Sequence, residues 1–296
     1  MRVLRRKAIG VVVYDHIIRA VSFEKVQKKP ICRGEFEYPL PDGAVKDGII
    51  LDVYKVSEGI KGMWSKYKLG KDNIILGISN SGVIARFAYF PDLPEDKLAG
   101  FVKYQAQEYI PMPVEDVVLD YIIEDRKKGE QGEQLEALMV AASKKMVNDF
   151  IAAFSEAGLD ISDIDYLPIA LLRMLPLEAQ NSGVAMVHLF DGNGAILIIQ
   201  NGIPRLARHF SVNAPSNIEP DKGMHKEISE VVSSIKYYQT HSQSVDIQKV
   251  FLCGQPRCVN DTIAPLESAL SIPVVPLKSA YNTAVETSLA LRGIGL

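Results

Sequence analysis

Three short segments, each after an apolar run, carry the residues of this chain that could bind phosphate. Asp15 follows the first apolar run, Asp191, Gly192 and Gly194 form a D-G-N-G turn after a later one, and Gly254 ends a third. Glycine lets backbone N–H groups approach a phosphate, and a carboxylate can hold a magnesium ion or its water. The pattern allows a phosphate-binding turn, although a D-G-N-G between apolar runs is also typical of a hairpin turn.

The other residue types that do chemistry are too scattered to predict catalysis or a metal site. Cys253 and Cys258 have a CxxxxC spacing without a second cysteine pair or a nearby histidine, so no zinc site is predicted. His188 ends an apolar run and has no second ligand at useful spacing, which favours a core histidine. We find no general base of the kind that a phosphotransferase needs, so no catalytic residue is predicted. The three cysteines, Cys32 included, favour free thiols in a reducing compartment.

Composition and charge exclude several classes of function. The chain of 296 residues suits two lobes of roughly 100–200 residues each. Its net charge of -3 gives no reason to expect binding to nucleic acid. No apolar run reaches the ~20 residues that span a bilayer, and the basic and then apolar start of the chain suits a first strand better than a signal peptide. We therefore expect a cytoplasmic protein.

Hydrophobic periodicity predicts the same set of elements twice. The first three strands cover 8–14, 17–23 and 31–38, and a second triplet covers 184–190, 194–200 and 203–210. Each triplet is followed by a helix and a strand, at 52–67 and 74–79 in the first set and at 226–241 and 249–252 in the second. This recurrence predicts an internal duplication. A last helix is expected at 281–291.

A segment between the two sets interrupts the repeat. A strand at 83–90 leads into an amphipathic helix that ends at Pro111 and Pro113, because neither proline can continue a helix. A strand at 117–124 and its partner at 135–142 follow, joined by the charged stretch DRKKGEQGEQ, which is predicted as a solvated hairpin loop. The remaining elements are a helix at 144–157, a strand at 160–166 and a short helix at 167–175.

The stretch YQAQEYIPMPVEDVVLDY at 104–121 resembles the insert subdomain of the PilM family, actin-like proteins of type IV pilus assembly related to FtsA and to the GspL and MshI cytoplasmic domains. The resemblance covers nearly the whole chain. It implies an α/β fold of two duplicated actin-like (ribonuclease H-like) βββαβα lobes, with an α/β subdomain inserted in the first lobe. The implied domains are a first lobe (1–90 and 160–180), an insert (91–159), a second lobe with a shortened outer subdomain at 213–225 (181–280), and a C-terminal helix packing back on the first lobe (281–296).

The chain departs from the family where the family binds nucleotide. The metal-directing Asp and the phosphate-approaching Gly of the first hairpin correspond to Val12 and Tyr14, and those of the second to His188 and Phe190. A hydrogen bond to a charged phosphate contributes about 1.5–3 kcal/mol, so the joint loss predicts a pseudo-ATPase without a bound cofactor. The alternative is an active ATPase or phosphotransferase that binds ATP and magnesium at a rearranged site made of Asp15, Asp191, Gly192, Gly194 and Gly254.

The resemblance also implies a partner. In PilM-like proteins the insert and the first lobe form a groove for the cytoplasmic N-terminal tail of PilN, a membrane protein with one span. Such a groove can bind an extended segment through a backbone edge and apolar pockets. The predicted contacts are Tyr104, Tyr109, Ile110, Pro111, Met112, Pro113, Val114, Val83, Ile84 and Arg86. Tyr109 and Ile110 suit core positions equally well.

The expected role is that of an adaptor. It would lie at the cytoplasmic face of the inner membrane, in the platform of a type IV pilus or a type II secretion system, grip the tail of a PilN-like protein, and relay contact to a cytoplasmic motor ATPase. A filament-forming protein like FtsA would share the same fold.

Overall fold

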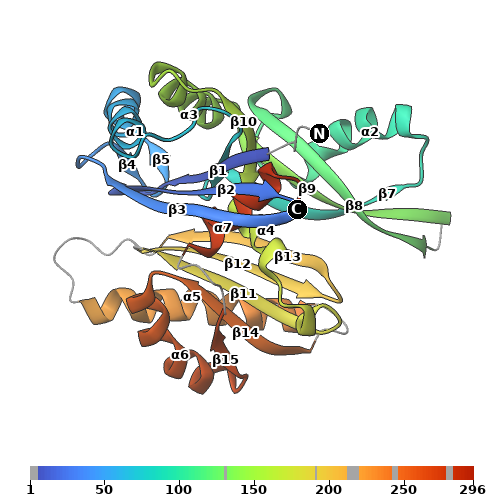
Figure 1. The fold of residues 1–296 in the computed structure, drawn as a ribbon. Coiled ribbons are helices and arrows are strands. Elements are labelled where there is room, and N and C mark those ends of the chain that lie inside the picture. The colour runs from blue at the N-terminus through green and yellow to red at the C-terminus, as the bar shows by residue number, and fades with distance from the viewer. Residues whose placement is uncertain (1–5, 130–131, 191, 212–219, 242–245, 278–282) are drawn as a thin grey trace.

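Two five-stranded sheets lie one above the other in the computed structural model, which describes residues 6–129, 132–190, 192–211, 220–241, 246–277 and 283–296 (Figure 1). The first sheet has the order β10-β6-β1-β2-β3. Its strands β1, β2 and β3 are antiparallel, whereas β6 and β10 run parallel to β1. The strands are β1 (Arg6–Val13), β2 (Ile17–Val26), β3 (Lys29–Pro39), β6 (Ile74–Ile78) and β10 (Ile161–Tyr166).

The second sheet repeats this topology. Its order is β13-β12-β11-β14-β15, with three antiparallel strands followed by two that run parallel to β11. The strands are β11 (Gly183–Phe190), β12 (Asn193–Gln200), β13 (Ile203–Ser211), β14 (Ile247–Gly254) and β15 (Val274–Pro276). The predicted duplication of a three-stranded meander with parallel additions is confirmed.

Helices cover the outer faces of both sheets (Figure 1). Helix α1 (Val53–Tyr67) starts where the Asp52 carboxylate accepts a hydrogen bond from the Lys55 backbone N–H at 3.0 Å, and it packs with α3 (Lys144–Glu156) on the first lobe. Helices α5 (Pro220–His241) and α6 (Pro256–Leu270) pack on the second sheet. Part of the polar loop predicted at 213–225 is therefore helix, because α5 begins at Pro220, and 212–219 lie outside the described residues.

The insert is a three-stranded sheet of order β7-β9-β8 with one helix on it. Its elements are β7 (Val83–Pro91), α2 (Glu95–Tyr109), a turn of 3-10 helix (Val114–Asp116), β8 (Val117–Gly129) and β9 (Gly132–Ser143). The prediction of a solvated loop over DRKKGEQGEQ was wrong, because β8 and β9 remain paired as far as Gly129 and Gly132. Charged side chains indicate only that a segment is solvated, and an exposed ladder of paired strands satisfies that condition as well as a loop does.

The last helix lies between the two sheets. Helix α7 (Ala284–Gly293) packs on β1, β2 and β6 and also contacts β14, and its residues 284–290 are all buried. Gly10 of β1 permits this approach, because a Cβ there would collide with the backbone oxygen of Glu286. The helix starts later than predicted, and Tyr281 lies outside the described residues.

Two shorter elements complete the first lobe. Helix α4 (Leu167–Ala170) follows β10 directly and contacts α7, and β4 (Val45–Lys46) pairs with β5 (Ile49–Ile50) in a small hairpin. Among the described helices, none is both long and apolar enough to cross a membrane.

Candidate functional site

Two aromatic side chains meet where the hairpin turns of the two lobes face each other. The ring of Tyr14, after β1, stacks on the ring of Phe190, at the end of β11, with centroids 4.1 Å apart and planes 27° apart. Both side chains are buried. They therefore fill the space between the two turns, and each ring lies on a different lobe.

A buried charge network surrounds this aromatic pair. The Tyr14 hydroxyl donates a hydrogen bond to Oε1 of Glu286 at 3.2 Å, and the Arg19 guanidinium carbon lies 4.9 Å from the centre of the Phe190 ring. Nε of Arg19 lies 2.9 Å from Glu37 and 4.0 Å from Glu286. Burial raises the pKa of the Glu286 carboxyl although Arg19 opposes that shift. Glu286 thus joins the last helix to the first hairpin.

His188 is part of the same buried cluster. The centre of its ring is 6.4 Å from that of Phe190, and the two ring planes are nearly parallel. Burial, and then the charge of Arg19, lower the pKa of His188 to about 3, so it is neutral at physiological pH. No group of three or more potential metal ligands occurs in the part of the chain that the structure describes.

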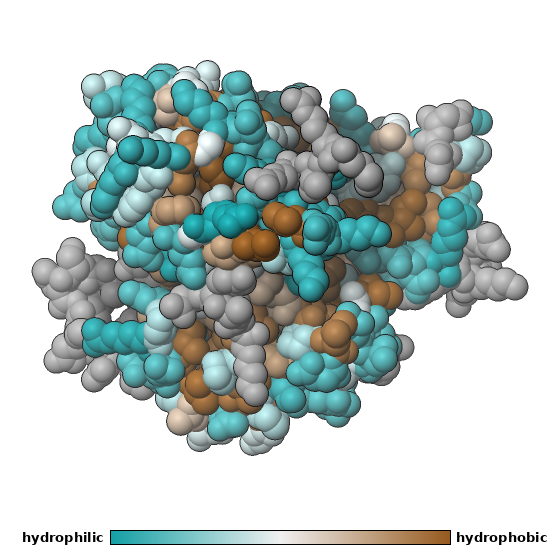
Figure 2. Space-filling view, viewed as in Figure 1, coloured by the Kyte–Doolittle hydropathy of each residue, from teal (hydrophilic) through white to brown (hydrophobic). Residues whose placement is uncertain are grey.

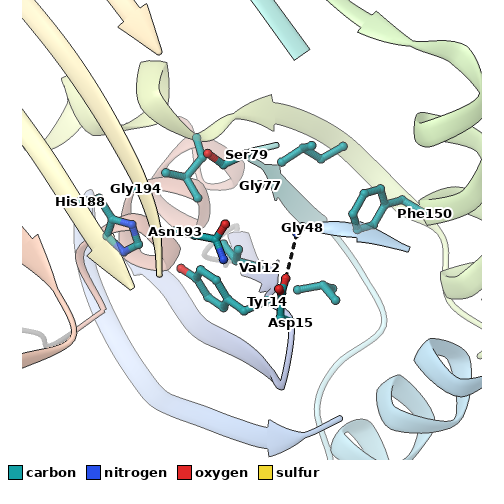
Figure 3. Close-up of a pocket in the computed structure, with 13 residues that line it drawn as sticks. Val12, Tyr14, Asp15, Gly48, Gly77, Ser79, Phe150, His188, Asn193 and Gly194 are labelled. Atoms are coloured by element: carbon teal, nitrogen blue, oxygen red, sulfur yellow. Dashed lines mark hydrogen bonds between the residues drawn. The ribbon is translucent and has the colours of Figure 1, made fainter. Parts of the chain in front are cut away.

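The space that remains between the turns is small. Its volume is about 20 Å³, and Tyr14, Asp15, His188 and Asn193 are among the residues that line it (Figure 3). A cavity needs about 10–15 Å³ to hold one water molecule. It therefore has room for about one water molecule and not for a triphosphate.

The residues predicted for a rearranged phosphate site have other partners. The two carboxylate oxygens of Asp15 accept hydrogen bonds from the backbone N–H groups of Asp47 and Gly48, at 2.8 and 2.9 Å (Figure 3). The Asp15 carboxylate is thus held by its own lobe. Both of its oxygens already have partners, so this carboxylate is not placed to hold a magnesium ion.

The predicted glycines also serve the fold. A Cβ at Gly194 would collide with the ring of Phe210, and one at Gly254 with the backbone of Leu189. Gly192 has a φ of 73°, as a hairpin turn requires. Asp191 lies outside the described residues. These glycines are explained by close packing and turn geometry.

The residues predicted to contact a partner do not form one surface. Ile110 and Val114 pack in the core of the insert, so these two side chains are not available to a ligand, whereas Val83 packs in the core of the first lobe and also lines a pocket there. The ring of Tyr109 packs edge-on against Phe90, 6.4 Å away. Tyr109, Ile110 and Val114 thus belong to the apolar core of the insert under α2, which for Tyr109 and Ile110 is the alternative that the sequence left open.

The other predicted contacts are accessible but separate. Tyr104 is 74% exposed on the outer side of α2, and Arg86 is exposed on β7. Pro111 and Pro113 are exposed, whereas Met112 and Ile84 are half-buried.

An apolar groove lies on the other face of the insert sheet. It has a volume of about 240 Å³ and separates that sheet from β10 and α4 of the first lobe. Val118 and Ile122 of β8 project into it while 47% and 54% exposed. Figure 2 shows hydrophobic surface on this side of the molecule. The other apolar residues that line it include Val83, Leu138, Val140, Ile164 and Ile169.

The sequence contained a signal for this groove. The run VVLDYII of β8 is apolar at both alternating sets of positions, so both faces of the strand need cover. Helix α2 covers one face, with Val117 in the core beneath it. The other face, with Val118 and Ile122, is the one that remains open.

One end of the groove is charged and tightly paired. Arg173 donates a hydrogen bond to the buried Asp165 at 2.8 Å, and Arg292 donates one to Asp163 at 2.7 Å. A second nitrogen of Arg292 lies 3.2 Å from Asp165. The positive and negative charges balance, so the cluster fixes the geometry of the groove wall and adds little net charge.

The fold is that of the actin-like proteins. The chain belongs to the family of the type IV pilus assembly protein PilM, whose model matches residues 10–208. The resemblance inferred from the sequence is thus confirmed, together with the predicted fold class.

Solved structures and a curated relative agree with this fold. A PilM–PilN type IV pilus biogenesis complex matches with 18% identity and a TM-score of 0.84, over 98% of this chain and 99% of that one. The cytoplasmic domain of EpsL, from the type II secretion system of Vibrio cholerae, matches with 11% identity and a TM-score of 0.57, over 97% and 95%. FtsA of Bacillus subtilis is 24% identical over 222 residues, 64% of this chain. The chain spans about half of FtsA, 49% of its length.

Proposed function

We propose that this protein is a type IV pilus adaptor that binds the cytoplasmic N-terminal tail of a PilN-like membrane protein in the groove between the insert sheet and the first lobe. The observation that carries the proposal is the exposure of Val118 and Ile122 in an apolar groove. Membership of the PilM family and the likeness to a structure that contains PilN support the choice of partner.

The groove suits an extended, mainly apolar segment. Strand β8 is at the edge of the insert sheet among the described strands, so its outer backbone groups can pair with a bound segment. Alternate side chains of that segment would then reach the apolar wall formed by residues such as Leu138 and Ile169. The bound tail would hold the protein at the cytoplasmic face of the inner membrane, where the partner supplies the membrane contact.

The adaptor would act without ATP hydrolysis. This part of the proposal is supported by the Tyr14–Phe190 stack, which occupies the space between the hairpin turns, and by the internal hydrogen bonds of Asp15. Titration calorimetry with ATP and magnesium is expected to give no binding heat at millimolar nucleotide. Micromolar binding would contradict the proposal.

The groove is tested with a labelled peptide that carries the N-terminal tail of the PilN-like protein from the same genome. Ile122→Asp places a charge in the apolar wall, and we expect at least about a tenfold loss of affinity, or 1.4 kcal/mol, by fluorescence anisotropy. Tyr104→Ala, on the outer side of α2, is the control and should leave the affinity unchanged. The reverse result would place the tail on the helix surface instead.

A further inference from the structure

Side chains bridge the two lobes at the centre of their interface. Tyr14 of the first lobe stacks on Phe190 of the second. Arg19 of the first lobe also lies against the Phe190 ring, with its guanidinium carbon 4.9 Å from the ring centre. An arginine over an aromatic ring in a buried setting adds an electrostatic attraction to the stacking. The contact is therefore both apolar and charged, and it crosses from lobe to lobe.

Polar contacts bridge the lobes beside this centre. The Ser79 hydroxyl lies 3.0 Å from Nδ1 of His209, and the Ser211 hydroxyl donates a hydrogen bond to the Asp47 carboxylate at 2.6 Å. Ser79 and Asp47 belong to the first lobe, and the other two residues to β13 of the second. The closure of the lobes is thus fixed at several points.

Helix α7 links this interface to the groove. Glu286, near its start, accepts the hydrogen bond from Tyr14, and Arg292, near its end, lines the groove and binds Asp163. The two residues are six positions apart, a rise of about 9 Å at 1.5 Å per residue. A buried helix of this length moves as a unit, so a shift at one end reaches the other.

We propose that the contacts of Tyr14, Arg19, Phe190 and Glu286 hold the lobes in one closed arrangement in place of a bound nucleotide, and that α7 transmits this fixed closure to the groove. The consequence for the partner rests on the proposed function of the groove. The partner site would then be permanently formed, and nucleotide would have no influence on it.

Hydrogen–deuterium exchange of the full chain tests this lock. Tyr14→Leu and Phe190→Leu keep apolar volume and remove the stacked ring. We expect about tenfold faster exchange of the backbone amides in α7 and β10, with α1 unchanged. Phe154→Leu is the matched control, because Phe154 is buried against Trp64 between α3 and α1. It should speed exchange in α1 and α3 and leave α7 as in the wild type.

Three outcomes would overturn the proposal. The first is uniform acceleration of exchange in all three variants, and the second is wild-type protection of α7 in Tyr14→Leu and Phe190→Leu. The third is slower exchange at the lobe interface of the wild type after millimolar ATP and magnesium are added. If a leucine variant does not fold, Tyr14→Phe still tests the link to Glu286, with faster exchange expected in α7 alone.

The exchange measurement needs no partner. Loss of the proposed tail binding would leave its result intact, so failure of the lock and failure of the proposed function can be told apart.

Discussion

The first lobe meets its two neighbours in opposite ways. Against the second lobe it is filled by aromatic rings, with about 20 Å³ left open. Against the insert it leaves a groove of about 240 Å³ with exposed Val118 and Ile122. Large side chains at turn positions fill the junction between the two lobes. At the junction between the first lobe and the insert, one face of β8 remains uncovered. The difference indicates which junction serves stability and which is available to a partner.

The largest effect is expected from removing a ring at the filled junction. Phe190→Ala should lower the free energy of unfolding by about 3–5 kcal/mol, because the buried ring is lost and a cavity remains. Ile122→Ala in the open groove should cost less than about 1 kcal/mol, because that side chain is 54% exposed. Urea unfolding of both variants measures the difference. Equal losses would remove the distinction between the two junctions.

Acid pH should weaken the filled junction selectively. Burial lowers the pKa of His188 to about 3 and that of His209 to about 4, from an ordinary 6.5. The unfolded chain therefore binds more protons below pH 6.5, and stability falls as the pH falls. Each histidine is expected to contribute a loss of about 3 kcal/mol between pH 6.5 and 4.

The measurement is urea unfolding as a function of pH. His188→Gln should flatten the curve over this range, whereas His16→Asn should not, since the side chain of His16 is 62% exposed. Parallel curves for the wild type and His188→Gln would show that His188 is already protonated in the folded protein near pH 6.

A moderate effect is expected at the charged end of the groove. Arg173→Ala should lower the free energy of unfolding by about 1–2 kcal/mol, because the buried Asp165 loses one charged partner and keeps Arg292. Arg126→Ala breaks an exposed pair with Asp92 and should cost less than about 0.5 kcal/mol. Thermal unfolding of both variants measures the two losses of stability. A larger loss in Arg126→Ala than in Arg173→Ala would contradict this prediction.

The smallest effect is expected from Glu286→Gln in mildly acid solution. Burial raises the folded pKa of Glu286, so the protonated form is favoured in the folded protein. The stability from this group is complete below the ordinary pKa of glutamate and is lost as the pH rises through the raised value. At a pH low enough to keep the folded carboxyl protonated, the substitution should therefore change the unfolding free energy by less than about 1 kcal/mol, because glutamine resembles the protonated acid. As the pH rises further, the variant should lose less stability than the wild type, and the opposite trend would contradict the raised pKa.

The topology could be predicted from the sequence because its signals are local. The short apolar runs of β1, β2, β11 and β12 and the alternating pattern of β3 indicate strands, and the triplet recurs in the same order. The paired end of β8 and β9 was missed because Arg126 and its charged neighbours are equally typical of a loop and of an exposed ladder.

The site could be predicted only in part. Tyr14 and Phe190 could be recognised as too bulky for a phosphate site, because that inference needs only the types of the two residues. The bond from Tyr14 to Glu286 joins residues 272 apart in sequence, and one sequence carries no signal for it. The predicted partner contacts lie mainly on α2 and the prolines that follow it. The sequence does not show which face of β8 is covered by α2, so it could not indicate that the face with Val118 and Ile122 stays open.

The burial of α7 has a consequence for the order of folding. This helix is the last described element, yet it packs on β1 and β2, which are the first. On the ribosome, β1 and β2 are therefore made more than two hundred residues before the helix that covers them. Such distant pairing slows folding and leaves apolar strands open to aggregation in the meantime. A shortened polypeptide that ends before α7 is thus expected to need chaperones.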